Sequence, residues 1–135
     1  MYVAQQFAVE PELALRQAAE RGVGDLVTHS ARGLDATMLP FVWLPDPAGF
    51  GVLTTHMARV NLQWHDQGPA MMVVHGPDAY ISPQIVPPAA GEQRVPTVPT
   101  WNYLAVHLFG QLVVHHDPDW KLASLRDLVD RKAGY

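Results

Sequence analysis

The chain has 135 residues, of which 48% are hydrophobic and 16% charged, a balance that predicts one globular domain over residues 1–135 and excludes a disordered chain. Nine basic residues are scattered along a sequence of net charge −4, which disfavours direct DNA binding by this chain alone. The absence of cysteine excludes disulfides and thiolate metal sites. The sequence shows no signal peptide and no apolar run of about 18 residues, so we expect a cytoplasmic protein without a membrane span.

The first predicted element is a helix over residues 12–21, a run of strong helix formers with Pro11 at its start and Gly22 directly after its end. Strands are then expected at residues 26–29 and 35–43, joined by a turn in which Gly33 most needs a positive φ. Proline has no backbone N–H. The second strand is therefore predicted to lie at an edge, to bend or to carry a bulge at Pro40.

Three further strands and a short helix are predicted in the middle of the chain. The strands are expected at residues 50–56, 70–75 and 79–82. Between the first two of these, polar residues mixed with Leu62 and Trp64 favour a short helix over residues 57–67.

The last third of the chain begins with residues 83–99, which contain five prolines and are expected to form a long loop. A long strand over residues 103–116 follows, with Gly110 as a kink or a point of close backbone approach. Asp117 and Pro118 then start a terminal helix that carries an apolar stripe on one face.

A helix, five or six short strands and a terminal helix, without βαβ alternation, predict a mainly β (α+β) fold, an antiparallel β-barrel with flanking helices. A barrel built from so short a chain has strand edges and aromatic side chains to cover. Symmetric pairing is the common way of covering them, so we expect a homodimer.

Motifs for metal binding, hydrolysis and nucleotide binding are missing from the sequence. His115 and His116 are adjacent in the predicted strand and would point to opposite faces, and no His-x-His or His-x-x-x-His pair occurs. Glycine-rich phosphate loops and the Gly-x-Ser-x-Gly elbow are absent as well. We therefore predict no metal site, and catalytic residues are not identified by motif.

One segment gathers side chains that bind anions at a predicted strand-to-helix junction, residues 54–61. It combines two hydroxyls, an imidazole, a guanidinium and a carboxamide, from Thr54, Thr55, His56, Arg59 and Asn61. An arginine fork and the free N–H groups of a helix N-terminus both suit phosphate oxygens. The segment is a candidate cradle for a phosphate monoester. Ordinary helix capping with a solvated Arg59 is the equally weighted alternative.

A second candidate segment is residues 96–103, followed by His107. Trp101, Asn102 and Tyr103 at the mouth of a barrel would stack on, and hydrogen-bond to, a flat heterocycle. Composition alone favours Trp101 and Tyr103 as interface or core aromatics, and both roles hold together if a ligand lies at a dimer interface. Strand alternation places Trp101 and Tyr103 on one face and Asn102 on the other.

Several stretches carry a resemblance to a known family. In chain order they are Met1-Tyr2-Val3 with Phe7, LVTH (26–29), GLDA (33–36) with LPF (39–41), HMARVN (56–61) with Trp64, GPDAYISP (76–83), VPTWNY (98–103) with His107, and DPDW (117–120). Over these stretches, which span nearly the whole chain, the sequence resembles the PaiB-like family of FMN-binding negative transcriptional regulators.

That resemblance implies an antiparallel split β-barrel of the pyridoxamine-phosphate-oxidase-like type, with FMN held between two subunits. By the same likeness, residues 54–61 would hold the ribityl phosphate, and Trp101, Asn102 and Tyr103 would come from the second subunit. The strand along the isoalloxazine ring would be residues 35–41, which include Asp35, Thr37, Met38 and Leu39.

The chain departs from that family in two places. It ends at Tyr135, before the family's C-terminal section, and it has Ile85 and Val86 where the family usually carries an aromatic pair. Three alternatives to an FMN-binding regulator therefore stay open. They are a flavin-dependent oxidoreductase for an unknown small molecule, a haem-binding relative with His107 or His56 as the iron ligand, and a cofactor-free dimer.

Overall fold

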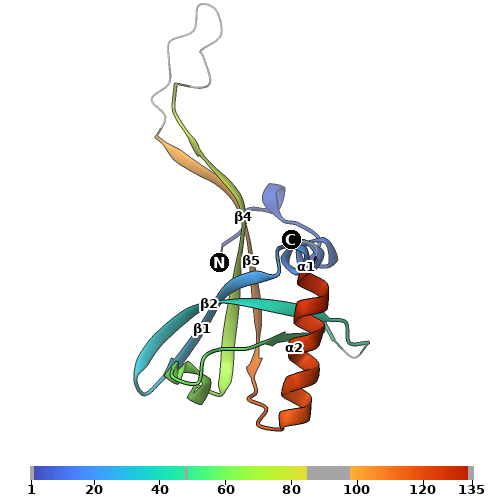
Figure 1. Cartoon of the computed structure of the whole chain (residues 1–135). Coiled ribbons are helices and arrows are strands. Elements are labelled where there is room, and N and C mark those ends of the chain that lie inside the picture. The colour runs from blue at the N-terminus through green and yellow to red at the C-terminus, as the bar shows by residue number, and fades with distance from the viewer. Residues whose placement is uncertain (1, 48, 85–97, 134–135) are drawn as a thin grey trace, which may run out of the picture.

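The computed structural model describes residues 2–47, 49–84 and 98–133 (Figure 1). The strands form one antiparallel sheet in the order β3-β2-β1-β4-β5, with two α-helices flanking it. The fold is therefore mainly β with flanking helices, as the sequence predicts. Its elements are η1 (Gln5–Phe7), α1 (Pro11–Arg21), β1 (Val23–Ser30), β2 (Gly33–Leu44), β3 (Val52–Thr55), η2 (Leu62–His65), β4 (Gly68–Ile81), β5 (Thr100–Leu112) and α2 (Pro118–Lys132).

The sheet is open: β3 and β5 are its edges, and no ladder joins them in the part of the chain that the structure describes. β2 pairs with β1 as far as Pro40 and with β3 from Phe41 onward. Because proline has no N–H to donate, the point at which β2 changes partner is where its presence disturbs the ladder least. The predicted barrel is thus a twisted sheet that stays split between its first and last strands in space.

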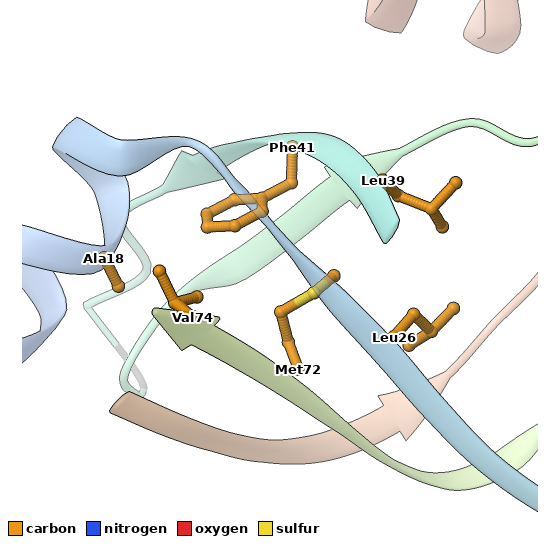
Figure 2. Close-up of a cluster of buried hydrophobic side chains, with 6 residues drawn as sticks. All are labelled: Ala18, Leu26, Leu39, Phe41, Met72 and Val74. Carbon is orange, nitrogen blue, oxygen red and sulfur yellow. The ribbon is translucent and has the colours of Figure 1, made fainter. Parts of the chain in front are cut away.

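A small apolar core lies between β1, β2 and β4, with one residue contributed by α1 (Figure 2). Its strand residues come from alternate positions, as expected for one face of a sheet. Phe41, 1% exposed, is the largest of them, and burying a side chain of this size stabilises the fold by about 2–3 kcal/mol. The six buried side chains are Ala18, Leu26, Leu39, Phe41, Met72 and Val74.

Both helices begin where the sequence predicts, and α1 also ends where predicted. α1 begins at Pro11, and Gly22 adopts a left-handed conformation (φ 57°) after its last residue, with its N–H donating to the carbonyl of Ala18 at 2.9 Å. Asp117 caps α2 by accepting from the N–H of Asp119 at 3.1 Å. α1 packs mainly against β4, and α2 packs against β2 and β3.

β4 and β5 continue beyond the body of the sheet as a two-stranded arm, residues 78–81 paired with residues 100–103 (Figure 1). A register shift between His75 and Asp78, at the Gly76-Pro77 step, separates the arm from the body. In the arm, Tyr80 lies opposite Trp101 and Asp78 lies opposite Tyr103. Directly paired residues share a face, so these four side chains lie on the same face of the arm.

The helix predicted over residues 57–67 is wrong. Only η2 is helical there, a single 3-10 turn capped by Asn61, whose side chain accepts from the N–H of Gln63. Gln63 is fully buried and its amide bonds to the neighbouring strands. A polar side chain used in this way anchors the segment to the sheet, and the pattern of polar and apolar residues does not reveal it.

Strand ends also differ from the prediction. β3 has four residues where residues 50–56 were expected, and β5 ends at Leu112 where a strand to residue 116 was expected. At Gly110 the register continues without a shift, and no atom lies within 4 Å of the place that a Cβ would take, so close backbone approach there is wrong. Most of the predicted loop, residues 85–97, lies outside the described residues.

Among the helices that the structure describes, none combines the length and apolarity needed to cross a membrane.

Candidate functional site

Two adjoining hollows lie between the free edges β3 and β5. The first, called the groove here, has a volume of about 730 Å³ and is bounded by β3, residues 56–59, the connection from β5 to α2 and the start of α2. The second, called the chamber, has a volume of about 540 Å³ and lies between α1, β3, β4 and β5. The residues that line both are Val52, Leu53, Thr55, Gln111 and Leu112.

The groove is rich in cationic and imidazole side chains. Arg59 lines one part of it and Lys121, from the first turn of α2, lines another. Three imidazoles join them, those of His56, His115 and His116, and no Asp or Glu lines the groove among the described residues. In a chain of net charge −4, this makes the groove locally basic, and a basic cleft attracts anionic ligands.

Flat rings form part of the same walls. Trp120 stacks on His115 with ring centroids 4.0 Å apart, and Trp64 meets His116 edge-on at 5.8 Å. The indole N–H of Trp64 also donates to the carbonyl of Arg59 at 3.1 Å, which holds the backbone at that position. The groove therefore combines fixed positive charge with aromatic surfaces, the two features that recognise a phosphorylated heterocycle.

Of the five residues predicted to form an anion cradle, the structure brings four into the groove: Thr54, Thr55, His56 and Arg59. The hydroxyl of Thr55 donates to the carbonyl of Pro40 at 2.6 Å, and that of Thr54 to a second β2 carbonyl at 3.5 Å. Each hydroxyl has one hydrogen. Both are thus engaged with β2, and Arg59 is the strongest anion-binding group of the four.

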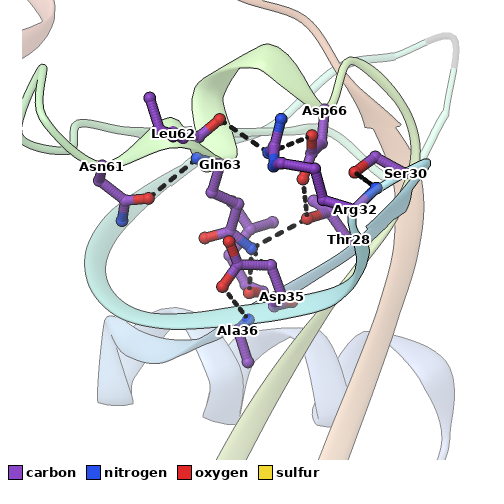
Figure 3. Close-up of polar contacts among 10 residues, drawn as sticks. Thr28, Ser30, Arg32, Asp35, Ala36, Asn61, Leu62, Gln63 and Asp66 are labelled. Carbon is purple, nitrogen blue, oxygen red and sulfur yellow. Dashed lines mark hydrogen bonds and ion pairs between the residues drawn. The ribbon is translucent and has the colours of Figure 1, made fainter.

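The fifth residue, Asn61, lies in a polar network beneath η2 (Figure 3). Its side-chain nitrogen donates to the hydroxyl of Thr37 at 2.9 Å, while its oxygen caps η2. Gln63 beside it donates to the carbonyls of Leu26 at 2.8 Å and Asp35 at 3.3 Å. These bonds attach η2 to the β1–β2 hairpin.

Asp66 completes the network. Its carboxylate is 1% exposed and accepts from the hydroxyl of Thr28 at 3.1 Å and from the guanidinium of Arg32 at 2.6 Å. Arg32 also donates to the carbonyl of Leu62 at 3.0 Å. The network fixes the segment that carries Arg59 into the groove, and the sequence reading missed it because its members are dispersed along the chain.

The β2 residues predicted to lie along a flavin ring border neither hollow. Leu39 is part of the core, Thr37 bonds to Asn61, and Asp35 accepts from the N–H of Ala36 at 2.8 Å. Met38 is 68% exposed, so a ligand beside β2 would meet the outer face of that strand.

The residues of the second predicted segment are separated in space. Trp101, Asn102 and Tyr103 are exposed on the arm, where the indole N–H of Trp101 donates to Asp78 at 2.8 Å. Their alternation along β5 agrees with the shared face predicted for Trp101 and Tyr103. His107 lies farther along β5 and lines the chamber.

The sequence reading missed the wall of the groove formed by His115, His116, Trp120 and Lys121. It placed the two histidines in a strand with opposite orientations, which is wrong, because β5 ends at Leu112 and both imidazoles line the groove. The helix start at Asp117 limits the strand to residue 116 at the latest, and no local signal marks its end at Leu112. No group of three or more His, Asp or Glu residues is placed to hold a metal ion in the described parts of the chain.

Comparisons with known proteins show the family of the chain. A family model described as "Putative FMN-binding domain" matches residues 1–134, and the chain therefore belongs to that FMN-binding domain family. It is also similar to "Uncharacterized protein YKL070W" of Saccharomyces cerevisiae, with 32% identity over 104 residues. That alignment covers 74% of this chain, and the chain spans 60% of the length of the yeast protein.

Proposed function

We propose that this protein binds FMN in the groove, with the ribityl phosphate beside Arg59. The observation that carries the proposal is the basic lining of the groove, which has no carboxylate among the described residues, in a chain that belongs to an FMN-binding domain family. A phosphate monoester dianion is favoured by positive potential and by the bidentate fork of an arginine.

The residues present fit this cofactor in charge, shape and size. Arg59 and Lys121 supply cations, and the stacked rings of Trp120 and His115 supply a flat surface. The volume of about 730 Å³ lies within the roughly 300–1,000 Å³ of small-molecule sites. Bound FMN would supply one- and two-electron redox chemistry, and the protein would supply orientation and charge.

The wider site assignment is part of the same proposal. Two exposed surfaces support a second subunit near the ligand: the outer face of β2 around Met38 and the aromatic face of the arm. In a homodimer, Trp101, Asn102 and Tyr103 of one copy would approach the FMN of the other. Asp35, Thr37 and Leu39 would then keep the β2 strand in place beside the ring.

The cellular role follows the resemblance. We propose a cytoplasmic FMN-binding protein with a negative regulatory role of the PaiB-like kind. The net charge of −4 and the pairing of Arg32 and Arg131 with carboxylates both disfavour direct contact with DNA by this chain alone.

Titration with FMN and with riboflavin tests the proposal. Arg59→Ala is expected to weaken FMN binding by about 10- to 100-fold, because a charge-assisted bond to the phosphate is lost. The Trp64 bond uses the carbonyl of residue 59 and survives the change. Riboflavin, which lacks the phosphate, should bind both proteins equally.

Arg126→Ala on α2 is the matched control, since Arg126 is exposed and lies outside the groove. It should leave both affinities unchanged. Equal loss of FMN and riboflavin in Arg59→Ala would remove Arg59 from the phosphate site. The absorption spectrum of the purified protein separates the other readings: a flavin band supports the proposal, a Soret band indicates haem, and a colourless protein that binds no added FMN contradicts it.

A further inference from the structure

A glycine of β5, Gly110, lines the chamber. Val106, Leu108 and Leu112 of that strand all pack against the core. Gly110 belongs to the same alternating series, so a side chain there would point toward the chamber. A Cβ at this position would meet no atom within 4 Å. The strand therefore interrupts its apolar stripe at the point where the chamber lies.

The residue opposite Gly110 is also small. Ala70 of β4 pairs directly with Gly110 and lines the chamber with it. Strand interiors favour β-branched and aromatic side chains, and glycine weakens a strand. The pair therefore contributes little side-chain packing to the sheet. It borders a hollow of about 540 Å³.

The lining of the chamber differs in chemistry from that of the groove. No Asp, Glu, Lys or Arg lines it among the described residues, and most of its surface comes from apolar side chains such as Leu15, Trp43 and Phe50. The β5 residues His107, Phe109 and Gln111 also border the chamber, at a strand whose alternation turns their side chains toward the other face. A largely apolar hollow of this size is typical of a small-molecule site.

We propose that the chamber binds an uncharged, apolar small molecule, in the position of a substrate next to the groove. The adjacency to FMN rests on the proposed function, because the groove and the chamber share part of their lining. Binding of an apolar ligand in the chamber stands independently of FMN.

The structure favours a small molecule over an extended segment that bridges β3 and β5. The free edge of β3 offers only the four residues Val52–Thr55 for pairing. The space above Gly110 and Ala70 lies on a face of the sheet, whereas a strand added at the edge of β5 would extend the ladder beside it. A segment or a second copy seated over the chamber is an outcome that the test distinguishes.

Methionine methyl groups give a reporter for each site. Met72 lines the chamber, Met57 lines the groove, and Met71 lies next to Met72 on the opposite face of β4. With ¹³C-methyl methionine, titration of the protein with 2-naphthol should shift the Met72 signal in a saturable way and leave Met71 unmoved. Titration with FMN should shift Met57.

Filling the chamber provides the decisive variant. Gly110→Val should weaken 2-naphthol binding roughly tenfold or more, because the new side chain occupies the space of the ligand. Its melting temperature should stay equal or rise, since the change adds an apolar, strand-favouring side chain in open space. Ala123→Val, on an exposed position of α2 outside both hollows, should leave 2-naphthol binding unchanged.

Ala70→Leu fills the chamber from the opposite strand and replaces Gly110→Val if that variant does not fold. The proposal is overturned if the Met72 signal does not shift when 2-naphthol is added. It is also overturned if the folded variant Gly110→Val or Ala70→Leu binds 2-naphthol as tightly as the wild type does. A Met72 signal that moves with protein concentration instead means that a second copy covers the chamber, which also overturns it. If 2-naphthol moves Met72 while FMN leaves Met57 unmoved, the chamber proposal holds and the proposed function fails alone.

Discussion

The ion pair between Asp66 and Arg32 shows how one residue supports the groove from a distance. The carboxylate of Asp66 is buried, whereas the guanidinium of Arg32 is half-exposed. Arg32 also bonds to the backbone of η2, so it holds η2 to the turn between β1 and β2. Loss of Arg32 would leave the buried carboxylate with a neutral donor, the hydroxyl of Thr28, and without its cation.

Arg32→Ala is therefore expected to lower the free energy of unfolding by about 2–3 kcal/mol, because the carboxylate stays buried without its cation. Arg131→Ala is the matched control: it breaks the exposed pair with Asp127 and should cost about 0.5 kcal/mol or less. Urea denaturation of both variants measures the difference. Equal losses would mean that the buried pair adds no more than a surface pair does.

Lys121 gives a second prediction at the same scale. Lys121→Ala should weaken FMN by about three- to tenfold, less than Arg59→Ala, because an ammonium is a point charge without the arginine fork. Riboflavin affinity should stay constant, and fluorescence titration measures both. A variant that loses riboflavin as strongly as FMN would place Lys121 beside the ring and away from the phosphate.

The sequence predicts Arg59 as an anion-binding residue but gives no such signal for Lys121. Arg59 stands in one short segment with other anion-binding side chains, so local composition reveals it. Lys121 and His116 come from the far end of the chain and reach the groove only because β5 stops at Leu112 and α2 then begins. The contact between these segments is tertiary, and no local pattern specifies it.

Two of the turns that lead into strands place glycine at a positive φ. Gly33 and Gly51 have the same φ, 104°, in the left-handed region that favours glycine. Around Gly33 a Cβ would meet no atom within 4 Å. At Gly51 a Cβ would lie 2.5 Å from the carbonyl oxygen of Leu44 and would also clash with the indole of Trp43.

The two glycines therefore make a matched pair of variants. Gly33→Ala should lower the free energy of unfolding by about 1 kcal/mol, because only the backbone conformation is penalised. Gly51→Ala should cost about 3 kcal/mol or more, because the Trp43 indole must also leave its bond to the carbonyl of Phe50. Thermal or urea unfolding measures both. Similar losses would show that the β3 entry relaxes around a side chain.

The elements themselves were predictable to the extent that their signals are local. Pro11 with Gly22 and Asp117 with Pro118 mark helix boundaries through backbone chemistry, and the structure confirms them. The segment at residues 57–67 has no such signal, since its conformation depends on the burial of Gln63 against two strands. The strand order and the open edge between β3 and β5 are likewise tertiary properties.

For the whole molecule, the open sheet and the arm leave apolar surface uncovered. Tyr80, Trp101 and Tyr103 are each more than half exposed on one face of the arm. A two-stranded ribbon that projects from its sheet is marginally stable in water by itself. Clustered aromatic side chains with exposed rings are typical anchors of protein interfaces, which supports the homodimer that the sequence predicts.

Sedimentation equilibrium should therefore give a mass close to twice the 14.9 kDa of the chain at micromolar concentration. Tyr103→Ser should weaken association by about tenfold or more, because a buried interface tyrosine often contributes 2 kcal/mol or more. Leu34→Ser removes a more exposed apolar side chain from the start of β2, away from the arm, and should leave association unchanged. A wild-type protein that sediments as a stable monomer would contradict the dimer. A dimer that Tyr103→Ser leaves intact would place the interface elsewhere, and the exposed face around Met38 would then be the surface to vary.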